Sequence, residues 1–215
     1  MRWIGVALAI GLLACGAAGA QQQIPPDSLA RLQDVFGAVW ENLWETSDEY
    51  WHRGEFDRCI AAGRLITQIN PHDTQAYEAA AWLMDSDLRE EDAEAFLREG
   101  LANNPDTYDL YFELGSFCYF RTRYEEAIPL FAACLTFADT PLFVRHMLAH
   151  AYEHAGCIGD ALDTWIEAEA AEPDSAIPPM QIDRIMQGGE PSQVPENNLR
   201  SIQQRKEERA KGLGN

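Results

Sequence analysis

The sequence is poor in positive charge. Its 215 residues include 35 aspartates and glutamates but only 16 lysines and arginines, which gives a formal net charge of −19. The two lysines, Lys206 and Lys211, both lie near the C-terminus. An acidic surface repels the phosphates of nucleic acids and the head groups of anionic lipids. The composition therefore argues against nucleic acid as a partner.

Long apolar segments are also absent. The longest, Trp3 to Ala14, has twelve residues, which is too short for a transmembrane helix. Arg2 precedes this segment and Ala18-Gly19-Ala20 follows it, the pattern of a secretory signal cleaved after residue 20. We therefore predict that residues 1–20 are a signal peptide and that the protein is exported, to the periplasm or beyond. Alternatively, Leu12-Leu13-Ala14-Cys15 resembles a bacterial lipobox, which would produce a lipoprotein anchored through Cys15.

Catalytic signatures are a third absence. The sequence has no G-x-S-x-G nucleophile motif, no phosphate-binding glycine loop and no C-x-x-C pair. Paired acids such as Glu90-Glu91 fall at predicted helix starts, where they complement the helix dipole. We therefore expect a protein that is not an enzyme and that needs no cofactor.

What the sequence does contain is a repeat of 34 residues. Pro71, Pro105 and Pro173 are separated by 34 and by twice 34 residues. The same shift aligns small residues at one position and mostly apolar residues at another through four consecutive units. These two sets are Cys59, Ala93, Ala127 and Ala161, and Tyr50, Met84, Cys118 and Tyr152. Each unit shows two stretches with the apolar spacing of a helix, separated by a short turn.

This pattern resembles the tetratricopeptide repeat (TPR) family. The third unit carries Leu114-Gly115-x2-Cys118 and the fourth Leu148-Ala149-x2-Tyr152. The resemblance implies an all-α fold, a right-handed solenoid of about four helix pairs with flanking helices. The predicted parts are an N-terminal segment and helix (21–39), units at 40–73, 74–107, 108–141 and 142–175, a capping helix (176–188) and a flexible tail (189–215).

Three local features depart from or extend this pattern. The turn glycine of the family is present as Gly54 and Gly156, but the second and third units have Leu88 and Thr122 instead. Upstream of the first unit, apolar residues predict either an extra helix that breaks near Gly37 or an extension of the first helix. Three of the four later cysteines occupy positions that need small or apolar core residues, which favours buried free thiols over disulfides.

The resemblance also implies a concave groove lined by the first helix of each unit. By register, the candidate groove residues are Trp44, Asp48, Trp51 and His52; Glu78, Trp82 and Asp85; Phe112, Tyr119 and Phe120; and His146, His150, Glu153 and His154. Many are aromatic and none is lysine or arginine. Such a groove suits a peptide or protein segment with apolar anchors and basic flanks. We therefore expect an exported interaction or scaffold module.

Two other functions stay open. His146, His150 and His154 are spaced by four residues, and residues 150–154 match the H-x-x-E-H pattern of some zinc proteases. Imidazoles one turn apart can bind zinc, so this face is an alternative metal-binding and possibly hydrolytic site. The same histidines could instead sense pH near 6. The other alternative is that the repeats mediate self-association into a homo-oligomer.

Overall fold

The computed structural model describes residues 27–191, 207 and 211. The predicted signal peptide, the alternative lipobox and most of the predicted tail lie outside the described residues. Within the described part, all regular secondary structure is helical. No helix in that part is long and apolar enough to cross a membrane.

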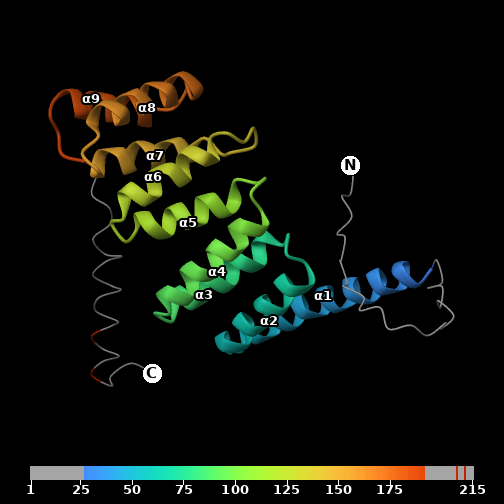
Figure 1. The fold of residues 1–215 in the computed structure, drawn as a ribbon. Helices are drawn as coiled ribbons and strands as arrows, with labels where there is room; N and C mark the ends of the chain where they lie inside the picture. The colour runs from blue at the N-terminus through green and yellow to red at the C-terminus, as the bar shows by residue number, and fades with distance from the viewer. Residues whose placement is uncertain (1–26, 192–206, 208–210, 212–215) are drawn as a thin grey trace, which may run out of the picture.

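The helices pair within each unit as the 34-residue register predicts. The pairs are α1 (Ser28–His52) with α2 (Phe56–Ile69), α3 (Thr74–Ser86) with α4 (Glu90–Asn103), α5 (Asp109–Tyr119) with α6 (Tyr124–Cys134), and α7 (Phe143–His154) with α8 (Ile158–Ala171). Each pair packs against the next, and α9 (Ile177–Met186) packs against α8 (Figure 1). The predicted all-α class, with four helix pairs and flanking helical segments, is confirmed for the described residues.

Helix α1 joins the predicted N-terminal helix to the first unit. It runs from Ser28 to His52 without a break at Gly37, so the extension is the correct alternative. Its second half packs against α2, where the thiol of Cys59 donates a hydrogen bond to the carbonyl of Ser47 (3.4 Å). Its first half continues beyond the end of α2 (Figure 1).

Glycines allow helices of the stack to approach closely. A Cβ atom at Gly63 would lie 2.9 Å from Cβ of Ala80, and one at Gly100 would lie 2.6 Å from Cγ of the buried Tyr77. Ordinary side chains cannot occupy such positions without moving their neighbours. Cys59, Cys118 and Cys134 are buried free thiols, as predicted, and Cys157 is an exposed free thiol.

The turn inside each unit needs a residue in the left-handed conformation. Gly54 and Gly156 have φ of +71° and +80°, and the equivalent Leu88 and Thr122 have +63° and +60°. A residue with a Cβ atom is destabilised in this conformation by about 1–2 kcal/mol. The second and third units therefore adopt the same turn as the first and fourth at the expense of backbone strain.

Thr122→Gly should relieve this strain. Thr122 is exposed and β-branched, so the change removes a strained backbone without opening a cavity. After the loss of chain entropy that glycine causes, we expect a gain of about 0.5–1 kcal/mol in the free energy of unfolding, measured by urea denaturation. The reverse change, Gly156→Thr, is the matched control and should destabilise. If Thr122→Gly were only as stable as the wild type, the left-handed conformation of Thr122 would not be destabilising the fold.

Candidate functional site

Asp73 fixes the aromatic side of α1 to the start of α3. This nearly buried residue lies in the turn between α2 and α3, and its Oδ1 accepts a hydrogen bond from the backbone N–H of Ala76 (3.0 Å), which caps α3. Its Oδ2 accepts hydrogen bonds from the indole N–H groups of Trp40 (2.8 Å) and Trp44 (3.0 Å). One carboxylate thus determines how two tryptophans of α1 face α3.

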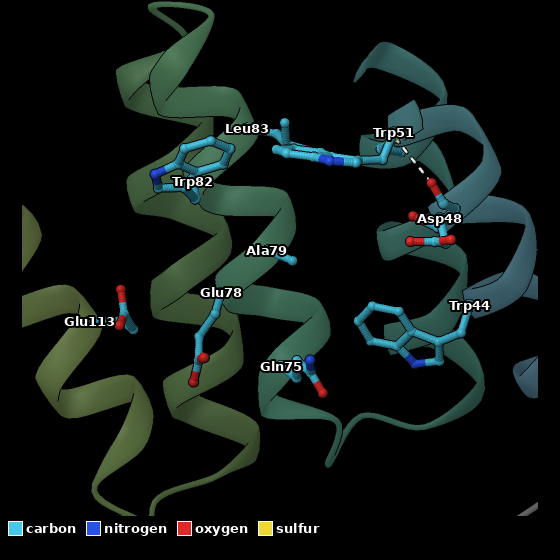
Figure 2. Close-up of a pocket in the computed structure, with 11 residues that line it drawn as sticks. Trp44, Asp48, Trp51, Gln75, Glu78, Ala79, Trp82, Leu83 and Glu113 are labelled. Carbon is cyan, nitrogen blue, oxygen red and sulfur yellow. Dashed lines mark hydrogen bonds between the residues drawn. The ribbon is translucent and has the colours of Figure 1, made fainter. Parts of the chain in front are cut away.

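A pocket of about 480 Å³ opens between α1 and α3 and reaches α5 (Figure 2). Its lining residues are Trp44, Ser47, Asp48, Trp51, Cys59, Gln75, Glu78, Ala79, Trp82, Leu83 and Glu113. Figure 2 shows Trp44 and Trp51 extending from α1 toward α3. The ring centroids of Trp51 and Trp82 are 5.7 Å apart, and the two residues are 44% and 59% exposed. Both side chains therefore have surface left for contact with a ligand.

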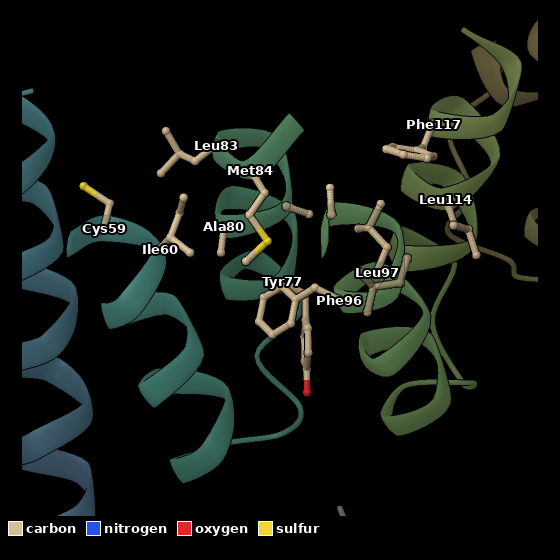
Figure 3. Packing of buried hydrophobic residues seen from close by; sticks show 13 residues of the cluster. Cys59, Ile60, Tyr77, Ala80, Leu83, Met84, Phe96, Leu97, Leu114 and Phe117 are labelled. Carbon is tan, nitrogen blue, oxygen red and sulfur yellow. The ribbon is translucent and has the colours of Figure 1, made fainter. Parts of the chain in front are cut away.

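The buried core forms the base of this pocket. Cys59 and Leu83 line the pocket and also belong to the apolar cluster that joins α2, α3, α4 and α5 (Figure 3). Cores are closely packed and resist deformation. The pocket wall is therefore held by the same contacts that hold the first three helix pairs together.

Two carboxylates of the pocket stand close to other acids. Burial, reinforced by the nearby Glu113, Asp109 and Asp73, raises the pKa of Glu78 to about 7. Burial and the charge of Asp109 also raise the pKa of Glu113. Of the described residues that line the pocket, none is lysine or arginine. An incoming cation would therefore interact favourably with both carboxylates.

The pocket brings together five of the predicted groove residues, namely Trp44, Asp48, Trp51, Glu78 and Trp82. It also includes Glu113, which the candidate set lacked. A shift of 34 residues aligns Glu78 with Phe112, one position before Glu113, so the register alone did not find it. The spacing of Asp109 and Glu113, one helical turn apart on the same face, was the available signal.

The predicted aromatic residues of the third unit are mainly structural. Tyr119 is buried and contacts Phe131 and Tyr124, which corrects its assignment to the groove lining. Phe112 packs between Phe131 (6.0 Å between centroids) and Phe143 (5.3 Å). The half-buried Phe120 packs edge to face on Tyr119.

Two further candidates have local partners outside the pocket. Asp85 forms an ion pair with Arg121, whose guanidinium also lies over the ring of Phe117 (3.5 Å). Arginine therefore does approach this side of the molecule, from a position that the lining set did not include. His52 is exposed, and its Nδ1 lies 2.9 Å from the backbone carbonyl oxygen of Asp48.

The three histidines of α7 pack against aromatic side chains of neighbouring helices. His146 lies 2.9 Å from the carboxylate of Glu172, both His146 and His150 pack on Trp165, and His154 stacks on Tyr124 (4.8 Å). Within the described part of the chain, no group of three or more His, Cys, Asp or Glu side chains is placed to hold a metal ion. Burial lowers the pKa of His150 to about 4. The expectation that His150 becomes protonated near pH 6 is therefore wrong.

Glu153 is not a groove residue either. It is 3% exposed, and its carboxylate accepts hydrogen bonds from Nε1 of Trp165 (2.9 Å) and from the guanidinium of Arg184 (2.5 Å). These contacts join α7, α8 and α9 at the end of the stack. A carboxylate held in this way binds the capping helix and is not open to solvent.

Comparisons with known proteins identify the fold. No model of a protein family matches the chain, and no curated protein matches it. Among solved structures, a crystal structure of MamA has a TM-score of 0.58 at 15% identity, covering 81% of this chain and 96% of that one. YrrB, a TPR protein, has a TM-score of 0.51 at 14% identity (69% and 76% covered), and PilF of Pseudomonas aeruginosa has 0.55 at 17% (68% and 67%). These similarities confirm the TPR solenoid fold.

Removing the carboxylate of Glu153 should loosen α9. Glu153→Ala leaves the buried indole N–H of Trp165 without its acceptor and removes the carboxylate that pairs with Arg184, so we expect a loss of about 2–3 kcal/mol in the free energy of unfolding. Urea denaturation followed by circular dichroism measures this loss. Glu167→Ala, at an exposed position of α8, is the control and should change stability little. A Glu153→Ala protein as stable as this control would refute the role of Glu153.

Glu78 should make stability depend on pH. Its folded-state pKa of about 7 lies above the ordinary value of 4.5, so the folded protein binds this proton more tightly than the unfolded chain. The wild type should therefore lose stability relative to Glu78→Gln as pH rises from 4.5 through 7. We expect a higher melting temperature for Glu78→Gln at pH 8 and little difference at pH 4.5. Glu125→Gln, exposed on α6, controls for the loss of one negative charge.

Proposed function

We propose that this chain is an exported interaction or scaffold module that holds a peptide or an extended protein segment against α1, α3 and α5. The observation that supports this function best is the pocket between Trp44, Trp51 and Trp82, whose described lining includes Asp48, Glu78 and Glu113 but no lysine or arginine. Export depends on the predicted signal peptide at residues 1–20. The module acts by binding and carries out no reaction of its own.

The chemistry of the pocket defines the ligand. Half-exposed indole rings bind apolar side chains and stack on guanidinium or ammonium groups, and aromatic residues contribute much of the affinity at protein interfaces. Asp48, Glu78 and Glu113 provide negative charge on the same surface. A segment with an aliphatic or aromatic anchor next to arginine or lysine could contact the indole rings with its anchor and the carboxylates with its basic residue. The pocket volume lies within the range of ordinary ligand sites.

The fold is compatible with this use. YrrB, which shares the fold, is a TPR protein with an unusual peptide-binding site. A stack of helix pairs presents its first helices side by side, so an extended segment can contact several units at once. In this chain the segment would cross the first helices of three units, because the pocket residues come mainly from α1, α3 and α5.

Selection from a random peptide library on the immobilised full chain tests the proposal. We expect the bound peptides to be enriched in arginine or lysine next to leucine, phenylalanine or tryptophan. A synthetic copy of a selected peptide should then bind Trp82→Ala at least about tenfold more weakly, because an exposed aromatic anchor is lost. Glu113→Gln should weaken the same peptide by removing a carboxylate. Fluorescence polarisation measures both affinities.

Ile166→Ala is the matched control for these variants. Ile166 is a similarly exposed apolar residue, but it lies on α8, outside the pocket. Its replacement should leave peptide affinity unchanged. Selected peptides that lack basic residues, or binding that survives both Trp82→Ala and Glu113→Gln, would show that the ligand uses other chemistry or another surface.

A further inference from the structure

The first half of α1 carries an apolar face that no described residue covers. This face consists of five residues that are each between 42% and 66% exposed: Leu29, Leu32, Val35, Phe36 and Val39. This part of α1 extends beyond the end of α2, away from the stack of helix pairs (Figure 1). Contiguous apolar surface of this kind marks an interaction site on a water-soluble fold.

The spacing of this face is suited to a second helix. Leu29, Leu32, Phe36 and Val39 alternate steps of three and four residues, the spacing of helices that pair side by side. The same stripe continues into the second half of α1 and reaches Tyr50, which packs into the core beside α2. One stripe is therefore covered by a helix along half of its length and uncovered along the other half.

The uncovered half has little helix stability of its own. It contains Gly37 and the β-branched Val35 and Val39, which all lower helix propensity. Helical segments of about a dozen residues are marginal in water without tertiary contacts. Burial of the apolar face would supply the stability that local sequence lacks.

The distribution of charge indicates which helix covers the apolar face of α1. Between Ser28 and Val39 the charged residues are Arg31 and Asp34, and the 100° step of a helix places both on the side opposite Phe36. The neighbours on the apolar side, Gln33 and Trp40, are uncharged. A protein of net charge −19 repels its own copies over most of its surface. On this face two copies can meet without bringing carboxylates together.

We propose that two copies of this chain pair through the first halves of their α1 helices, in antiparallel orientation. A two-fold axis near residue 34 places Leu29 against Val39 of the partner subunit and Leu32 against Phe36 of the partner subunit. The antiparallel orientation keeps the two acidic stacks at opposite ends of the helix pair. The interface has few apolar layers, so its dissociation constant lies in the micromolar range. This pairing does not depend on the peptide pocket.

Sedimentation equilibrium of the full chain over a micromolar concentration series tests the pairing. The wild type should show a monomer–dimer equilibrium, and Leu32→Glu with Phe36→Glu should be monomeric throughout. The matched control is Leu65→Glu with Ile166→Glu, two equally exposed apolar residues on α2 and α8, which should dimerise as the wild type does. A monomeric wild type, or a dimer that survives the Leu32/Phe36 change, overturns the proposal.

A cross-link tests the orientation and does not depend on weakening the helix. With Cys157→Ser to remove the exposed thiol, an equimolar mixture of the Leu32→Cys and Phe36→Cys single variants should form mixed disulfide-linked dimers on mild oxidation, and each variant alone should form few. A parallel pair would instead link each single variant to itself. Leu65→Cys in the same background is the control and should not form linked dimers. Removal of residues 192–215 should leave the dimer intact. If that removal instead converts a monomer into a dimer, the chain's own tail covers the face and the proposal is wrong.

Discussion

The stack of helices depends on a glycine, Gly100, that lets α4 approach its two neighbouring helices closely. At Gly100 on α4, a Cβ atom would lie 2.6 Å from Tyr77 on α3 and 2.9 Å from Leu110 on α5. One helix pair cannot bury its own apolar face, so contacts of this kind carry the fold from each unit to the next. They also set the distance between α3 and α5. Glu78 follows Tyr77 directly and Glu113 lies about one turn after Leu110, so the packing constraint brings the pocket carboxylates together.

Two carboxylates of the molecule, Glu94 and Glu78, lie in opposite electrostatic environments. At the start of the second helix α6, Arg123 contacts Glu94 (2.7 Å) and Glu126 (2.7 Å), and the side-chain hydrogen bond from Arg123 lowers the pKa of Glu94 to about 2. On α3, burial and the charges of Glu113, Asp109 and Asp73 raise the pKa of Glu78. The arrangement around Glu78 weakens the fold at neutral pH, and groups that are destabilised in this way are concentrated at binding sites.

The sequence predicted the helices well because helix spacing and small-residue contacts are local properties that recur every 34 residues. It predicted the candidate site less well. The repeat register identifies which residues share a helix face, but it does not identify the side chains of other elements that pack against that face. Glu153 shows the difference. Its repeat position suggested an open groove, but Arg184 comes from α9, outside the repeat pattern, and covers it. Likewise Arg121, from the turn after α5, neutralises Asp85. A repeat pattern is least informative about contacts in the last unit and in the turns, because residues outside the repeated positions make those contacts.

The pocket and the face of α1 would respond oppositely to ionic strength. A basic peptide is drawn to Asp48, Glu78 and Glu113 by charge, and dissolved salt screens that attraction. Pairing through α1 joins two uncharged apolar surfaces, whereas the acidic remainder of each copy repels the other copy. Dissolved salt screens this repulsion and leaves the apolar contact intact, so it should strengthen the pairing. Both surfaces include parts of α1, the pocket through Trp44 and the paired face through Phe36. One continuous helix can therefore present a bound segment and a second copy of the chain at its opposite ends.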